Sequence, residues 1–233
     1  MPPLAFLTPE ELTAVRLSLT VATSAALLAL PAGIALGYLL ARKRFAGKWL
    51  VEAMVSIPLV LPPVVTGYLL LILLGTRGPI GSFLLNCFGI RLVFNMQAAV
   101  VAAMVVSFPL MVRAIRLAFQ SVDPRLEMAA RSLGAGRLRA FVTVSLPLAR
   151  RGIVAGWTLC FARSLGEFGA TMLLASNIAG ETRTIPLAIF SMTQRPGGIE
   201  ASWRLVVLAI LLACAAMILS ELLERGQSHH EST

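Results

Sequence analysis

Long apolar stretches without a charged residue dominate the chain. Residues 17–41, 53–76 and 92–112 form uncharged runs of 25, 24 and 21 residues. Each run is longer than the roughly 20 residues that cross a bilayer as a helix. Two further runs are less regular, because 205–220 holds only 16 uncharged residues and 147–175 carries two charges in its middle. The pattern predicts an all-α, polytopic membrane protein.

The uncharged runs predict five transmembrane helices in a single domain, residues 1–223. Their expected bounds are about 14–41, 50–75, 95–118, 147–175 and 203–223. The uncharged segment Thr184–Gln194 has 11 residues, which is too short for a crossing, so we expect it to be re-entrant or interfacial. The polar C-terminal tail, residues 224–233, is expected to be disordered.

Composition and the placement of charge support this interpretation. Of the 233 residues, 58% are apolar and 13% charged, against about 25% charged residues in soluble domains, which excludes a water-soluble fold. Lys and Arg number 20, and most of them fall in the loop after the first span, in the segment between the third and fourth spans, and in the tail. The positive-inside rule then places the N-terminus outside and the C-terminus in the cytoplasm.

Residues for catalysis or metal binding are sparse. The three cysteines are far apart, and both histidines lie in the tail, so neither a disulfide framework nor a metal site is predicted. The chain contains no Gly-x4-Gly-Lys-Ser/Thr phosphate loop and is therefore not expected to hydrolyse ATP itself. The basic residues follow membrane topology, so nucleic acid is not an expected partner.

Prolines predict irregular helices. Pro31 lies in the first expected span, Pro58, Pro62 and Pro63 in the second, and Pro109 in the third; each removes a backbone hydrogen bond, and we expect each to interrupt its helix. The run 57–65 is a candidate for a translocation pathway or its gate. An ordinary kink that shapes packing explains it equally well.

A short helix is predicted between the third and fourth spans, at about 124–137. Asp123 followed by Pro124 is a strong helix start, and Gly134 or Gly136 would end the helix. Apolar residues repeat at intervals of three and four in between, at Leu126, Ala129, Ala130 and Leu133, which indicates an amphipathic helix. Its arginines could simply hold it against anionic lipid.

This segment resembles the signature loop of ABC-importer permeases, Glu-Ala-Ala-x3-Gly-x9-Ile-x-Leu-Pro. Here Ala129-Ala130 is followed after three residues by Gly134, and after nine more by Val144-Ser145-Leu146-Pro147. Met128 occupies the glutamate position, with Glu127 one residue earlier. In that family the short helix docks into the ATPase subunit, which implies coupling roles for Glu127, Ala129, Ala130, Leu133, Gly134, Ala135 and Arg137.

Other motifs resemble the molybdate permeases within that family. They include Phe161–Thr171, Gly180–Pro186 and Pro196-Gly197-Gly198, and sulfate permeases share Glu167-Phe168-Gly169 more loosely. The resemblance implies a type I ABC-importer permease in a prokaryotic inner membrane. It would import molybdate by alternating access as a homodimer, with ATPase subunits that bind ATP and Mg²⁺, an extracytoplasmic molybdate-binding protein, and surrounding membrane lipid as partners.

Three alternatives remain from the sequence. Sulfate or thiosulfate, and tungstate, are alternative substrates. A membrane anchor that only recruits a partner would not need the proline-rich span or the charged fourth span. A secondary transporter is disfavoured, because such proteins show paired repeats and the chain has none.

The candidate pathway residues are Pro62, Pro63, Arg163, Glu167 and Gly169. Arg163 and Glu167 lie four residues apart and so on one face of a helix. Arg163 either guides an oxyanion through the pore or belongs to a structural ion pair that locks the fourth span to a neighbouring helix or to the second permease subunit. We favour the ion pair, because a strong anion site would trap the substrate. Gly169 allows close helix approach, which is more often packing than function.

Overall fold

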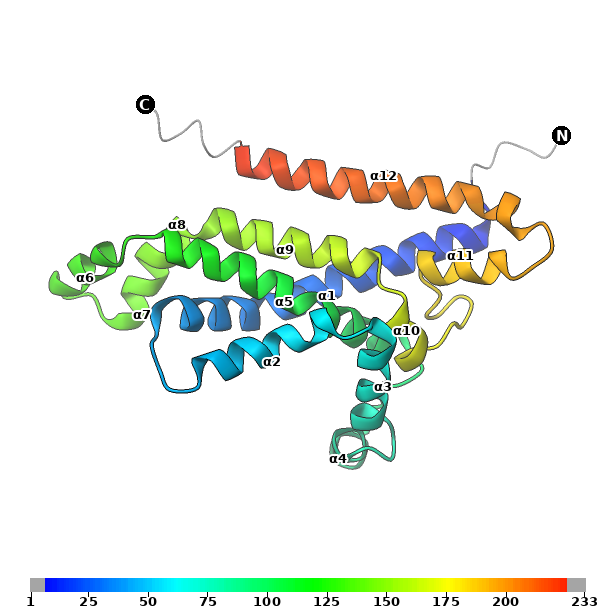
Figure 1. The fold of residues 1–233 in the computed structure, drawn as a ribbon, viewed down its shortest axis with the longest axis horizontal. Helices are drawn as coiled ribbons and strands as arrows, with labels where there is room; N and C mark the ends of the chain where they lie inside the picture. The colour runs from blue at the N-terminus through cyan, green and yellow to red at the C-terminus, as the bar shows by residue number, and fades with distance from the viewer. Residues whose placement is uncertain (1–6, 226–233) are drawn as a thin grey trace.

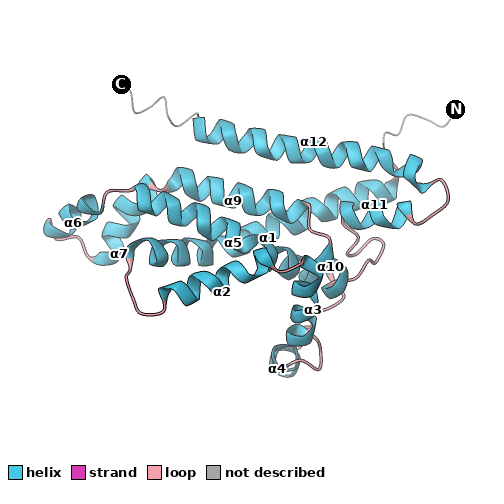
Figure 2. Cartoon of the chain, in the orientation of Figure 1, coloured by secondary structure: helices cyan, strands magenta, loops and turns pink. Residues whose placement is uncertain are grey.

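The computed structural model describes the backbone of residues 7–225 and the side chains of residues 7–218. Over these residues the chain is helical and contains no strand (Figure 2). The predicted all-α fold is confirmed for this part of the chain. The predicted tail, residues 224–233, lies outside the described residues from 226 onward, and residues 224 and 225 belong to the last helix.

Three helices form the centre of the bundle. They are α1 (Pro9–Arg42), α5 (Met96–Ser121) and α9 (Arg150–Leu165), and each packs against the other two. Small residues let their backbones approach closely. A Cβ atom on Gly33 would lie 2.7 Å from Sδ of Met111. The core is accordingly rich in fully buried alanines, among them Ala22, Ala25, Ala26, Ala98, Ala99, Ala102 and Ala103.

The segment between α1 and α5 is broken into shorter helices. α2 (Lys48–Val60) and α3 (Pro63–Leu74) meet at a bend of 113°. α4 (Pro79–Phe88) follows, and Figure 1 shows α3 and α4 projecting from the side of the bundle. α3 packs against α10 (Gly169–Leu174).

The two ends of the bundle differ (Figure 1). At one end, here named the α6 end, lie α6 (Pro124–Ser132), α7 (Arg137–Ala140), the π-helix η1 (Phe141–Ser145) and α8 (Leu146–Leu148). At the opposite end, the α11 end, α11 (Ile185–Thr193) packs against α1 and α12 (Gly198–Arg225).

Polar contacts fix the α11 end. Oε1 of Glu11 lies 3.3 Å from Nη2 of Arg204, which ties α1 to α12. The Ser18 hydroxyl accepts a hydrogen bond of 2.7 Å from the backbone N–H of Ile185. This satisfies a backbone donor in the first turn of α11 that has no partner within the helix.

Several helix expectations need correction. α1 and α5 continue through Pro31 and Pro109, so these prolines do not interrupt their helices. α2 likewise continues through Pro58, and the break comes at Leu61–Pro62. A single proline removes one hydrogen bond, whereas adjacent prolines remove two donors and also force the preceding residue out of the helical region.

The fourth and second expected spans are each divided. In place of one helix over 147–175, α9 ends at Leu165 and α10 begins at Gly169. By length and composition, three helices of the described chain can cross a membrane, namely α1, α5 and α12, and the bent α2–α3 pair makes a fourth. α4 was not predicted, because its ten residues lie between two expected spans.

Candidate functional site

α6 starts where the sequence predicts. The Asp123 side chain accepts a hydrogen bond of 2.9 Å from the backbone N–H of Arg125, and Pro124 occupies the first helical position. α6 ends at Ser132, five residues before the expected bound of 137, because Gly134 adopts a left-handed φ of +91°. A left-handed residue directly after a helix is a common stop, and glycine adopts it without strain.

Apolar side chains protrude from the α6 end. Leu133 is 90% exposed and Leu138 is 76% exposed. Leu126 and Met128 are also exposed, as is Ala129. An exposed apolar patch of this kind on a helix that projects from the bundle is typical of a surface that docks a partner protein.

Glu127 faces the opposite way, into the bundle. The Tyr38 hydroxyl donates a hydrogen bond of 2.9 Å to its Oε1, and the Ser145 hydroxyl donates one of 2.8 Å to its Oε2. The Tyr38 ring is held edge-on between Phe119 and Phe141, with centroids 5.2 and 4.7 Å away. One carboxylate thus joins α6 to α1 and to η1. Sequence reasoning missed both hydroxyl partners.

The other predicted coupling residues take different positions. Ala129 and Ala130 lie within α6, and Ala135 and Arg137 lie beyond its end, with Arg137 opening α7. Ala130 and Ala135 are half-buried, and Arg137 is exposed. The backbone N–H of Ala135 donates to the carbonyl of Ala130 at 3.1 Å, which closes the end of α6.

Two helix breaks meet at the side of the bundle. The α2–α3 bend at Pro62–Pro63 lies against the α9–α10 break at 166–169, and we call this contact the broken-helix junction. A Cβ atom on Gly169 would lie 3.0 Å from both Cβ of Pro63 and the backbone N of Val64. A Cβ on Gly67 would lie 2.7 Å from Cα of Ala170. The structure therefore brings Pro63 and Gly169 together, and Pro62 lies one residue before this contact.

Arg163 and Glu167 flank the same break. Oε2 of Glu167 lies 2.9 Å from Nη1 of Arg163 in an ion pair, and Oε1 accepts a hydrogen bond of 2.9 Å from the backbone N–H of Ala170. The Glu167 side chain is 2% exposed, whereas that of Arg163 is 29% exposed. Glu167 therefore both neutralises Arg163 and caps the first turn of α10.

A polar cluster lies beside this ion pair. Oγ of Ser107 in α5 is 3.0 Å from Sγ of Cys160 and accepts a hydrogen bond of 3.0 Å from the Ser164 hydroxyl, both in α9. All three side chains are buried. Small hydroxyl and thiol side chains bond helices in an apolar bundle at close range. The cluster holds α5 to α9 directly before the helix break.

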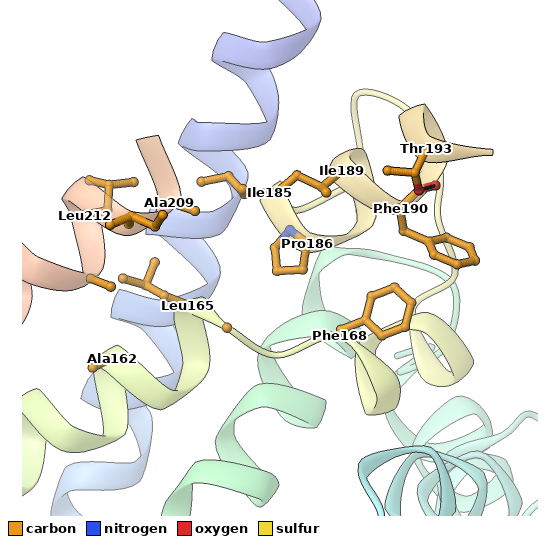
Figure 3. Close-up of a pocket in the computed structure, with 13 residues that line it drawn as sticks. Ala162, Leu165, Phe168, Ile185, Pro186, Ile189, Phe190, Thr193, Ala209 and Leu212 are labelled. Atoms are coloured by element: carbon orange, nitrogen blue, oxygen red, sulfur yellow. Dashed lines mark hydrogen bonds between the residues drawn. The ribbon is translucent and has the colours of Figure 1, made fainter. Parts of the chain in front are cut away.

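An apolar cavity of about 650 Å³ opens between α9, α11 and α12. Figure 3 shows the rings of Phe168 and Phe190 on one side of it and Leu165 and Leu212 on the other. The lining carries no charged side chain. It is therefore not a site for an inorganic anion. Among the described residues, no group of three or more His, Cys, Asp or Glu side chains is placed to hold a metal ion.

The family assignment rests on similarity over most of the chain. Residues 33–229 match the family described as binding-protein-dependent transport system inner membrane component. The chain belongs to this permease family. The prediction that the chain belongs to the ABC-importer permease family is thereby confirmed. The protein is a multi-pass inner-membrane protein.

Relatives of this permease include permease proteins of molybdenum and sulfate transport systems. The chain is 54% identical over 219 residues to the molybdenum transport system permease protein ModB of Escherichia coli K12, covering 94% of this chain and 96% of the relative. The ModB protein of Haemophilus influenzae is 51% identical and is covered to 94%. The sulfate transport system permease protein CysW of Synechocystis is 32% identical and is covered to 72%.

Solved structures show the same fold. A bacterial transporter for alginate, crystallised with its pentasaccharide-bound periplasmic protein, aligns with a TM-score of 0.71 at 17% identity, covering 98% of this chain and 82% of that one. An amino-acid ABC transporter aligns with a TM-score of 0.63 at 24% identity, covering 93% and 94%. The permease therefore has the fold of ABC-importer permeases.

Proposed function

We propose that this permease imports molybdate, with ATP hydrolysis supplied by a partner subunit. The proposed substrate rests on the 54% identity to ModB of Escherichia coli over nearly the full length of both chains. Molybdate is a tetrahedral oxyanion, as is sulfate, and the sulfate permease CysW is more distant at 32% identity. Tungstate and sulfate or thiosulfate remain the alternative substrates.

The proposed complex has three kinds of subunit. Two copies of this chain form the pathway, since one five-span chain without a repeat makes a two-fold pathway only by pairing. ATPase subunits hold ATP and Mg²⁺ at the α6 end, and a molybdate-binding protein docks at the α11 end. Five crossings follow if α9 crosses together with α1, the α2–α3 pair, α5 and α12, with the N-terminus outside.

Coupling is proposed to pass through α6. Leu133 and Leu138 contact the ATPase subunit, while Glu127 transmits its movement to α1 and η1. The support is the division of α6 into an exposed apolar side and a carboxylate bonded inward. Movement of the bundle then opens the pathway alternately to either side, with the broken-helix junction as the candidate gate.

The experiment is ATP hydrolysis by the full-length permease in liposomes, with its ATPase subunit and binding protein. We expect molybdate-loaded binding protein to stimulate hydrolysis and sulfate-loaded protein not to. Stimulation by sulfate-loaded protein alone would mean that the permease proposal holds and the ion is wrong. Failure of the ATPase subunit to associate would contradict the coupling role of α6.

A membrane anchor that only recruits the ATPase is the competing function. Gly134→Val distinguishes the two functions, because the left-handed φ of +91° at this position strains any residue with a Cβ. A transporter loses ATP-driven uptake in this variant while its helices stay folded. An anchor would show no uptake in either form of the chain.

A further inference from the structure

A small basic cavity lies where the end of α1 meets α6. Its volume is about 170 Å³, and its lining includes Arg42 and Lys43 at the end of α1 and Arg131 of α6. Glu127 is the one acidic side chain among the lining residues. The lining therefore carries a net positive charge.

Arg42 has unused donors in this region. Its Nε and Nη2 atoms are buried, and neither has a hydrogen-bond acceptor among the described residues. Leaving buried guanidinium N–H groups unpaired costs free energy that an acceptor would recover. An anion or another strong acceptor that binds Arg42 would therefore be stabilised by these unpaired donors.

Glu127 is not the acceptor for the unpaired donors of Arg42. Its two carboxylate oxygens accept hydrogen bonds from Tyr38 and Ser145. The ion pairs of the described residues do not include one between Glu127 and Arg42 or Arg131. Two guanidinium groups and one ammonium group thus surround the cavity with no carboxylate paired to them.

We propose that this cavity binds the phosphate of an anionic lipid in the cytoplasmic leaflet. Arginine presents its donors in a planar fork that matches a phosphate group. The cavity lies at the end of the apolar stretch of α1, where headgroups begin, and Tyr38 beside it is a residue typical of that boundary. This rests on the proposed orientation, which puts the α6 end in the cytoplasm.

The surroundings suit a lipid better than a free anion. Tyr38 on the lining is followed in α1 by Leu39, whose side chain is 38% exposed. Acyl chains would cover such apolar side chains, which free inorganic phosphate cannot do. Basic pockets between helices on the cytoplasmic side are typical sites for anionic headgroups.

The test measures which lipid stays bound to the purified full-length chain. The protein is equilibrated in detergent with equal parts of phosphatidylglycerol and phosphatidylcholine, and native mass spectrometry counts the bound molecules. We expect the wild type to retain phosphatidylglycerol preferentially. Arg42→Gln and Arg131→Gln should each weaken this preference about fivefold, which is about 1 kcal/mol per basic side chain near an anionic surface.

Two further variants control for charge and folding. Arg44→Gln removes an exposed arginine from the same loop that does not line the cavity, so its preference should equal that of the wild type. Arg42→Lys keeps the charge without the planar fork and should fall between wild type and Arg42→Gln. Equal losses in Arg42→Gln and Arg44→Gln would overturn the proposal, because the attraction would then not be local.

Other occupants would appear as distinct outcomes. Full displacement of phosphatidylglycerol by millimolar inorganic phosphate would mean that the site takes a free anion, and the lipid source is wrong. An unchanged lipid preference in Arg42→Gln, together with weaker binding of the ATPase subunit, would assign the cavity to an acidic side chain of that subunit. Lipid retention needs no ATP or binding protein, so its failure leaves the transport proposal intact.

Discussion

The α6 end and the broken-helix junction interrupt regular helices in opposite ways. At the α6 end, polar contacts point inward to Glu127 and apolar side chains point outward. At the junction, Gly169 and Gly67 bring backbones into contact, and the charged pair Arg163–Glu167 is turned toward the helix break. The first arrangement suits a partner that is still to bind, and the second suits a contact made within the chain.

The comparison implies that the junction is the more sensitive region to substitution. Gly169 and Gly67 each lie against backbone atoms of the facing helix, so a side chain added at either glycine must be absorbed by a backbone shift. At the α6 end many side chains are exposed, and the hydrogen bonds of Glu127 are the long-range contacts that a substitution would remove.

Glu167→Gln should destabilise the permease most. The amide still caps α10 but no longer neutralises Arg163. Removal of one member of a buried pair costs about 3–5 kcal/mol, and we expect the lower end of this range because the Arg163 side chain is 29% exposed. Thermal unfolding in detergent measures the loss.

The double variant Arg163→Gln, Glu167→Gln is its control. It restores neutrality and should recover most of the lost stability. Near-normal uptake by the double variant would rule out a role for Arg163 in guiding the anion. Unrecovered stability would contradict a structural ion pair.

Gly169→Val should come next. Its side chain would collide with Pro63 and with the backbone of Val64, and overpacking of this kind costs about 2 kcal/mol. The same unfolding assay applies, with uptake in liposomes as a second measurement.

Gly166→Ala is the matched control for this glycine. Its Cβ would meet nothing closer than the Arg163 carbonyl oxygen at 4.0 Å, so its stability should stay within about 0.5 kcal/mol of wild type. Equal losses in both glycine variants would contradict close packing at the junction.

Glu127→Ala should disturb coupling more than folding. Loss of its two hydrogen bonds costs about 1–2 kcal/mol, and α6 loses its link to α1. We expect fewer molybdate ions transported per ATP hydrolysed, with smaller losses in Tyr38→Phe and Ser145→Ala.

Tyr68→Phe serves as the control for these hydroxyl variants. Tyr68 is 56% exposed, so removal of its hydroxyl should leave coupling unchanged. An unaltered transport ratio in Glu127→Ala would show that α6 is held by other contacts.

Met128→Glu should have the smallest effect. It restores the glutamate of the signature loop at a side chain that is 55% exposed, and surface changes of this kind stay within about 0.5 kcal/mol. Circular dichroism melting and ATPase stimulation should both match wild type. A clear loss of stimulation would mean that this side chain contacts the ATPase subunit.

Local signals explain which elements the sequence predicts well. α5 begins one residue after the expected bound of 95, because an uncharged run of helical length can be recognised without tertiary context. Asp123 and Pro124 mark the start of α6 for the same reason. The break at 166–169 contains no proline and so has no local sequence signal. It is accompanied by the close packing of Gly169 against Pro63, which is a tertiary contact.

Long-range partners lie beyond the reach of local patterns. Tyr38 and Glu127 are separated by 89 residues, and no periodicity connects them. The resemblance to the signature loop implied a coupling role for Glu127, but it did not reveal that the carboxylate is bonded within the chain to Tyr38 and Ser145. Arg163 and Glu167 were predictable as a pair because four residues form one helical turn.

The length of α1 suits it to transmit movement between the two ends of the bundle. Its 34 residues make a continuous rod of about 50 Å at 1.5 Å per residue. Near one end Tyr38 holds Glu127, and toward the other Ser18 and Glu11 hold α11 and α12. A tilt of α1 imposed at the α6 end would therefore displace its other end in the opposite direction. A single movement of one helix would then change the openings of the pathway on both sides of the membrane.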